Sequence, residues 1–72
     1  MNLENYNLSR SEWENLIDQW IIGRNSERNR KMLKRRLLDG ITYERLAEEF
    51  DMSVQNVCIT IYKCQDKVFK RL

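Results

Sequence analysis

The amino-acid sequence predicts an all-α fold of four helices, and three observations lead to that class. Apolar residues recur at steps of three and four along most of the chain, which is the period of an α-helix. The chain has no proline, and its two glycines, Gly23 and Gly40, stand where helices should end. Its 72 residues suffice for a single domain and leave little room for a catalytic cavity. The predicted elements are a lead-in at 1–8 and helices at 9–22, 26–38, 42–50 and 53–71.

The first predicted helix is acidic on one face and broadly apolar on the other. Ser9 and Glu12 have the spacing of a capping box, and Leu8 and Trp13 have that of a hydrophobic staple. Its apolar face consists of Trp13, Leu16, Ile17, Trp20 and Ile21. We interpret the two tryptophans as core residues, because so short a chain needs them there. The alternative is a surface for a partner or a second copy of the chain, since Trp is favoured at interface centres.

The lead-in before this helix has no periodic pattern. Its apolar residues Leu3 and Tyr6 are candidates to lie against the body of the domain.

The second predicted helix is strongly basic. Asn25 or Ser26 can cap its start, and Gly40 can close its end. Its inner face consists of Met32, Leu33 and Leu37. The cations around that face are Arg24, Arg28, Arg30, Lys31, Lys34, Arg35 and Arg36.

The net charge of +2 hides a segregation of charge along the chain. The segments 1–23, 24–38, 39–53 and 54–72 carry −3, +6, −4 and +3. Seven cations against the single Glu27 favour contact with nucleic acid or an acidic protein. The alternative is a solvated face, or one paired with acidic neighbours such as Glu44, Glu48 and Glu49.

The third and fourth predicted helices are joined by a short corner. Thr42 can cap the third helix, and its inner face consists of Leu46, Ala47 and Phe50. Asp51 and Met52 make the corner, and Ser53 can cap the fourth helix. The fourth helix has an inner face of Val54, Val57, Ile61, Cys64 and Val68. A cap, a small residue, a short corner and a second cap are typical of a helix-turn-helix with an extended C-terminal helix.

The outer face of the fourth helix carries groups that can read a DNA duplex. It consists of Gln55, Asn56, Ile59, Thr60 and Lys63. The amides can bond an adenine edge, the isoleucine and the threonine methyl can meet a thymine methyl, and the lysine can bond guanine or phosphate. We therefore predict that these five residues read bases and that this helix is a recognition helix.

The segment from about 28 to 72 also resembles a known family. It contains a basic helix ending in LLDG, then ITYERLAEEF, then MSVQNV, and then a long helix with regularly spaced lysines. In this order and spacing it resembles region 4 of bacterial sigma factors, the promoter-reading helix-turn-helix domain, and the small stand-alone regulators similar to it. The resemblance implies phosphate contacts at Thr42 and Ser53, and base reading at Gln55, Asn56 and Thr60. Asp51 departs from it, because such proteins often carry Gly or Asn there.

Phosphate contacts are expected on both sides of the corner and along the basic helix, because Lys and Arg release counterions from a duplex. The predicted phosphate-contacting residues are Thr42, Tyr43, Ser53, Arg28, Lys31, Arg35 and Lys67.

Several chemistries are not supported by the residues. There is no histidine and no Gly-rich loop, so we expect no enzyme, cofactor, metal site or small-molecule ligand. Cys58 and Cys64 lie six residues apart on one predicted helix, too far for a disulfide, and we interpret them as small apolar residues. No apolar run approaches the roughly 20 residues that span a bilayer, and no signal peptide is visible, so we expect no membrane and a cytoplasmic protein.

The predicted function is a sequence-specific, double-stranded-DNA-binding transcription regulator of bacterial or phage type, resembling a stand-alone sigma region 4 domain. One such module makes few base contacts, so a homodimer on a two-fold site or a partner such as RNA polymerase is expected. The alternative is a protein-interaction or inhibitor module of mobile-element type. It would bind RNA polymerase or another nucleic-acid enzyme through the basic or the tryptophan-bearing helix. RNA binding ranks lower, because the aromatic residues that would stack on bases are assigned to the core.

Overall fold

The computed structural model describes residues 7–72, which form four helices and contain no strand. The helices are α1 (Arg10–Trp20), α2 (Ser26–Asp39), α3 (Tyr43–Phe50) and α4 (Val54–Phe69). The predicted all-α class is therefore confirmed, and each predicted helix boundary lies within two residues of the observed one. The predictions for Leu3 and Tyr6 lie outside the described residues.

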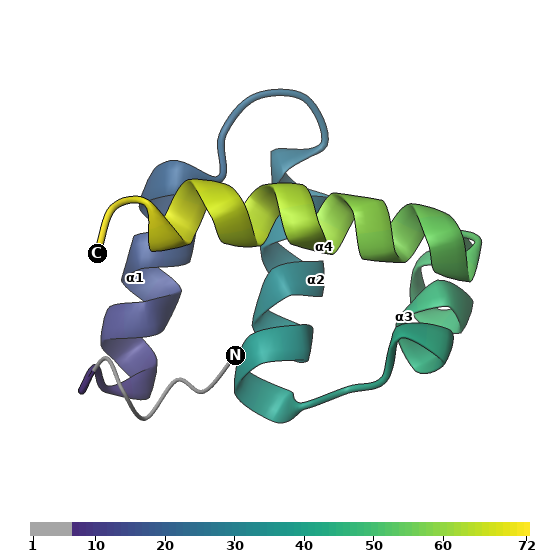
Figure 1. Ribbon diagram of the computed structural model, residues 1–72, viewed down its shortest axis with the longest axis horizontal. Helices are drawn as coiled ribbons and strands as arrows, with labels where there is room; N and C mark the ends of the chain where they lie inside the picture. Colours follow the sequence, from purple (N-terminus) through teal and green to yellow (C-terminus); the bar gives the residue numbers. More distant parts are fainter. Residues whose placement is uncertain (1–6) are drawn as a thin grey trace.

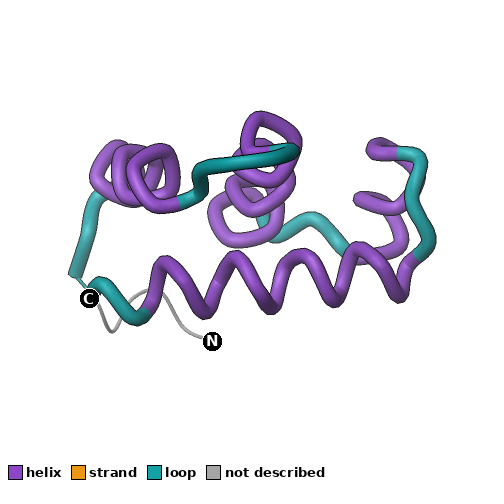
Figure 2. Tube along the Cα trace, turned by 90° about the horizontal axis from the view of Figure 1, so that it is seen from above, coloured by secondary structure: helices purple, strands orange, loops and turns teal. Residues whose placement is uncertain are grey.

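The four helices form two layers. α4 runs along the long dimension of the molecule, with α1 near its C-terminal end and α3 near its N-terminal end (Figure 1). α1, α2 and α3 lie in a row on one side of α4, and each of the three packs against it (Figure 2). α4 therefore has one face in the core and leaves the opposite face to solvent.

The core lies between these layers and receives side chains from every helix. The buried residues are Trp13, Ile17, Ile21, Met32, Leu33, Leu46, Ala47, Val57, Ile61, Cys64 and Val68. Trp13 meets Phe69 edge to face, with 5.7 Å between ring centroids. Trp20 is half-buried and has the guanidinium of Arg71 at 4.1 Å from its ring centroid. The interpretation as a core residue is confirmed for Trp13, whereas Trp20 is partly buried at the edge of the core.

Most of the predicted helix ends follow from local capping. Ser9 and Glu12 form the predicted capping box at the start of α1. Gly40 caps the end of α2 in a left-handed conformation with φ +67°, where an L side chain would be strained. Asp51 takes the same conformation at the end of α3, with φ +53°. Asp at this corner is therefore compatible with the turn, as its short polar side chain allows.

Two predictions about helix ends are wrong in whole or in part. Asn25 occupies the N-cap position of α2, but its side chain makes no capping hydrogen bond, because its left-handed backbone, with φ +60°, is not the extended conformation of a capping residue. Ser26 is the first residue of α2 rather than its cap. α1 already ends at Trp20, with Ile21 as an extended C-cap, so Gly23 lies in the loop and does not close the helix.

One residue assigned to the inner face of α4 is exposed. Val54 is 41% exposed and is the first residue of α4, at the end of the helix. The remaining predicted inner residues of α4 are buried, so the direction of its inner face is correct.

Candidate nucleic-acid interface

α3 and α4 form a compact helix-turn-helix unit. The corner closes with a hydrogen bond from the backbone N–H of Met52 to the carbonyl of Ala47, at 2.9 Å. Ala47 and Leu46 are buried against Val57 and the rest of the core. The small side chain of Ala47 allows the two helices to approach closely, as the sequence predicts. The exposed side of α4 is thereby held at a fixed angle to the start of α3.

The predicted base-reading residues lie mainly on the solvent side of α4. Gln55, Asn56 and Lys63 are exposed, and Ile59 is 44% exposed. Thr60 is half-buried at the edge of this surface. The structure thus brings four of the five residues together on one open face.

Thr42 and Ser53 are the exposed caps of α3 and α4. The Thr42 hydroxyl accepts from the Arg45 N–H at 3.2 Å, and the Ser53 hydroxyl accepts from the Asn56 N–H at 3.1 Å. Each hydroxyl hydrogen still has the capacity to donate to a phosphate oxygen while the cap stays intact. Both residues can therefore cap a helix and contact DNA at the same time.

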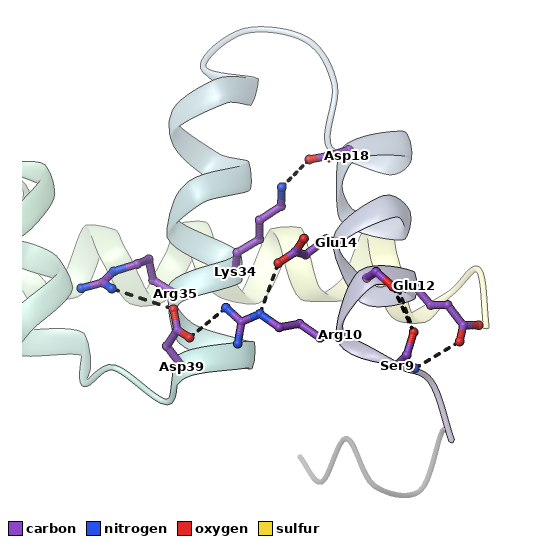
Figure 3. Close-up of polar contacts among 9 residues, drawn as sticks. Ser9, Arg10, Glu12, Glu14, Asp18, Lys34, Arg35 and Asp39 are labelled. Atoms are coloured by element: carbon purple, nitrogen blue, oxygen red, sulfur yellow. Dashed lines mark hydrogen bonds and ion pairs between the residues drawn. The ribbon is translucent and has the colours of Figure 1, made fainter.

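Much of the charge on α2 is paired within the protein, and Figure 3 shows the contacts of Lys34 with Asp18 and of Arg35 with Asp39. Lys34 pairs with Asp18 of α1 at 2.8 Å. Arg35 pairs with Glu49 of α3 and lies 3.8 Å from Asp39. The alternative interpretation, in which the basic run is paired with acidic neighbours, is confirmed for these two cations. A phosphate contact by Arg35 has to compete with Glu49.

The Arg35–Glu49 pair also shifts the titration of both groups. The hydrogen bond from Arg35 lowers the pKa of Glu49, and the nearby positive charges of Arg45 and Lys31 act in the same direction. The same hydrogen bond raises the pKa of Arg35. Since both side chains are about one-third exposed, solvent screens the pair and limits its contribution to stability.

Two further arginines of α2 donate to backbone carbonyls. Arg30 donates to the Ile21 carbonyl at 2.7 Å, and Arg36 donates to the Ile41 carbonyl at 3.0 Å. These bonds hold the loops on either side of α2. Sequence reasoning missed this role, because no local pattern shows which carbonyl a long side chain will reach.

Four predicted DNA-contacting cations form no ion pair with a described residue. They are Arg28, Lys31, Lys63 and Lys67. Burial raises the pKa of Cys64, whereas the nearby charges of Lys67 and Arg28 lower it. The first three turns of α4 carry no acidic residue, and the first acidic residue of the helix is Asp66. This part of the surface is therefore electrostatically suited to an anion.

An aromatic cluster lies on the other flank of α4. Tyr62 is 58% exposed and meets Tyr43 of α3 edge to face, with 6.3 Å between centroids. Arg36 stacks on Tyr43, with its guanidinium carbon 4.2 Å from the ring centroid. A hydrogen bond with Tyr43 raises the pKa of Tyr62. Sequence reasoning omitted Tyr62, although its spacing of three from Ile59 already placed it near the outer face.

Comparisons with known proteins assign no family to the chain. No protein-family model matches the sequence, and no curated protein or solved structure is significantly similar to it. Within residues 7–72, no helix combines the length and the apolar character needed to cross a bilayer.

Proposed function

We propose that this protein is a sequence-specific double-stranded-DNA-binding regulator whose helix α4 enters the major groove. The observation that carries the proposal is the division of α4 into two faces. Val57 and Ile61 are fully buried, while Gln55 and Asn56 on the other side are exposed and offer amides suited to adenine. Such a regulator would act in the cytoplasm.

The charge distribution supports the same proposal. α4 has no acidic residue before Asp66, and Lys63 and Lys67 extend outward without an ion pair to any described residue. The exposed residues of α4 before Lys63 are uncharged, and the cations lie beside them. This arrangement suits a groove whose edges are lined by phosphates. A helix is about 10–12 Å wide and the major groove about 12 Å wide, so α4 fits between the two strands.

The alternative, a module that binds RNA polymerase or another nucleic-acid enzyme, receives less support. Trp13 is buried and Trp20 lies under Arg71, so neither offers an open aromatic surface. On the basic helix, Lys34 and Arg35 are already paired. Absence of DNA binding in the test below would favour this alternative.

The test combines site selection with a matched pair of variants. Duplexes bound by the protein are selected from a random pool, and affinities for the selected site and for a scrambled site are then measured. Gln55→Ala with Asn56→Ala should remove discrimination between the two sites and retain salt-dependent residual binding. The control is Asn15→Ala with Gln19→Ala, which removes two exposed amides from α1 and should leave discrimination unchanged.

Two results would contradict the proposal. The first is no enrichment of any site, with no binding to random duplex at low salt and micromolar protein, which would favour the protein-interaction alternative. The second is a Gln55 and Asn56 double variant that folds normally by circular dichroism and discriminates as well as the wild type. A two-fold symmetric selected site would indicate a homodimer on DNA.

A further inference from the structure

The exposed side of α4 has two flanks that cannot both face the bases. Because an α-helix turns by about 100° per residue, Tyr62 and Lys63 point to opposite sides of the outward direction, which Ile59 marks. The Lys63 flank continues to Lys67, which is exposed and lies about one turn further along α4. The Tyr62 flank lies against the start of α3. The rotation of α4 in the groove decides which flank meets base edges.

The position of α3 favours the Tyr62 flank. In a helix-turn-helix, the first helix crosses the DNA backbone while the second enters the groove, so one duplex must face both. The N-cap of α3, Thr42, is an exposed polar residue, and Tyr43 follows it. Tyr43 contacts Tyr62, so the side of α4 that shares a duplex with α3 is the side of Tyr62.

Tyr62 is also held in place more firmly than its exposure suggests. Its ring contacts Tyr43, whose own ring lies under Arg36, and Arg36 is bonded to the Ile41 carbonyl. These contacts tie α4 to the end of α2 and the start of α3. A large side chain that is 58% exposed and yet fixed in orientation loses little entropy on binding.

We propose that Tyr62 is a base-contacting residue, and that α4 presents Gln55, Ile59 and Tyr62 to the base edges. Of the two amides of the proposed function, Gln55 then contributes most of the base reading, because Asn56 lies on the Lys63 flank. Lys63 and Lys67 then face a phosphate strand, so Lys63 contributes charge and not sequence reading. The span from Gln55 to Tyr62 is about 10 Å of helix, or two turns. Asp66 comes one turn later, where its negative charge suits a helix that is leaving the groove. This inference rests on the proposed function and specifies its contact surface.

The chemistry of the contact follows from the Tyr62 ring. Tyr62 is 58% exposed and packs edge to face on Tyr43, so the open part of its ring is the apolar group that it offers to DNA. Apolar groups read the thymine methyl in the major groove. The expected partner of Tyr62 is therefore one thymine of the selected site.

The test removes the ring and the thymine methyl separately. Each thymidine of the selected site is replaced in turn by deoxyuridine, which lacks only the methyl group, and affinities are measured for wild type, Tyr62→Ala, Tyr62→Phe and Lys63→Ala. At one thymine, wild type and Tyr62→Phe should lose affinity on loss of the methyl group, and Tyr62→Ala should not. Tyr62→Ala should also lower discrimination at that base pair by about five- to a hundredfold. Lys63→Ala should weaken binding to all sequences and reduce the salt slope by about 0.9.

The outcomes separate this inference from the proposed function. Absence of any sequence-specific duplex binding by the wild type would overturn both. Sequence-specific binding in which Tyr62→Ala keeps every methyl dependence, or a selected site without a methyl-dependent thymine, would overturn the assignment of Tyr62 alone. A Lys63→Ala variant that changes base preference at one position, with an unchanged salt slope, would also overturn it. Circular dichroism of Tyr62→Ala checks that the exposed substitution leaves the fold intact.

Discussion

Replacing both Lys63 and Lys67 with alanine should reduce the salt dependence of DNA binding by an amount that follows from the structure. Four predicted DNA-contacting cations form no ion pair with a described residue, namely Arg28, Lys31, Lys63 and Lys67. Each neutralised phosphate contributes about −0.9 to the slope of log affinity against log salt, so four contacts give about −3.6. The double variant keeps two of them, and its slope should be about −1.8.

This difference is large enough to measure directly. Lowering the salt from about 200 mM to about 50 mM should raise wild-type affinity about 150-fold and that of the variant about 12-fold. The assay is fluorescence anisotropy of a labelled duplex over a series of salt concentrations. Lys63 and Lys67 are both exposed, so the substitutions should not disturb the core.

A second double variant provides a control with the same change in net charge. Lys34→Ala with Lys70→Ala removes two lysines whose charges are already met by Asp18 at 2.8 Å and Asp66 at 2.9 Å. Because a paired lysine releases few counterions from DNA, this control should keep a slope close to that of the wild type. Equal slopes for the two double variants would refute the argument, since binding would then depend on net charge and not on the position of free cations.

Three further predictions concern stability and reactivity. Leu46→Ala, at a fully buried position, should lower the free energy of unfolding by about 2–5 kcal/mol in urea titrations. Leu72→Ala, at an exposed position, should lower it far less. Equal losses of stability would contradict the assignment of Leu46 to the core. Because the pKa of Glu49 is lower in the folded protein than its ordinary value of 4.5, the ionised carboxylate stabilises the fold at pH values above 4.5. This contribution disappears as the pH falls through the pKa of the folded state. Glu49→Gln should therefore lose less stability than wild type on acidification, and a larger loss would contradict the argument. Cys64, buried and with a raised pKa, should react with iodoacetamide more slowly than half-buried Cys58 in the native protein, a difference that should vanish in denaturant.

Local signals account for the parts of the fold that were predicted correctly. The capping box at Ser9, the left-handed corner at Asp51 and the apolar stripe of α4 each depend on residues within one or two helical turns. Such patterns do not depend on contacts with distant parts of the chain. For this reason the number, order and inner faces of the helices could be read from the sequence.

Long-range geometry decided the parts that were missed. Arg35 and Glu49 lie 14 positions apart, and Arg30 reaches a carbonyl nine positions before it. A count of cations along the chain does not show which of them will meet a carboxylate, because that depends on how α2 lies between α1 and α3. The spacing of Tyr62 from Ile59 placed it near the outer face, but its contact with Tyr43 could not be predicted, since that contact arises only when α4 packs on α3.

The sequence by itself determined an all-α chain with a helix-turn-helix near its C-terminal end, and it determined most of the residues that α4 buries in the core. Helical period and capping depend on residues that are close in the sequence, so they can be predicted from short segments of it. Only the tertiary structure decided which cations remain unpaired and which flank of α4 lies beside the start of α3. Both depend on the angles at which whole helices cross, and those angles are set by the packing of the core as a unit.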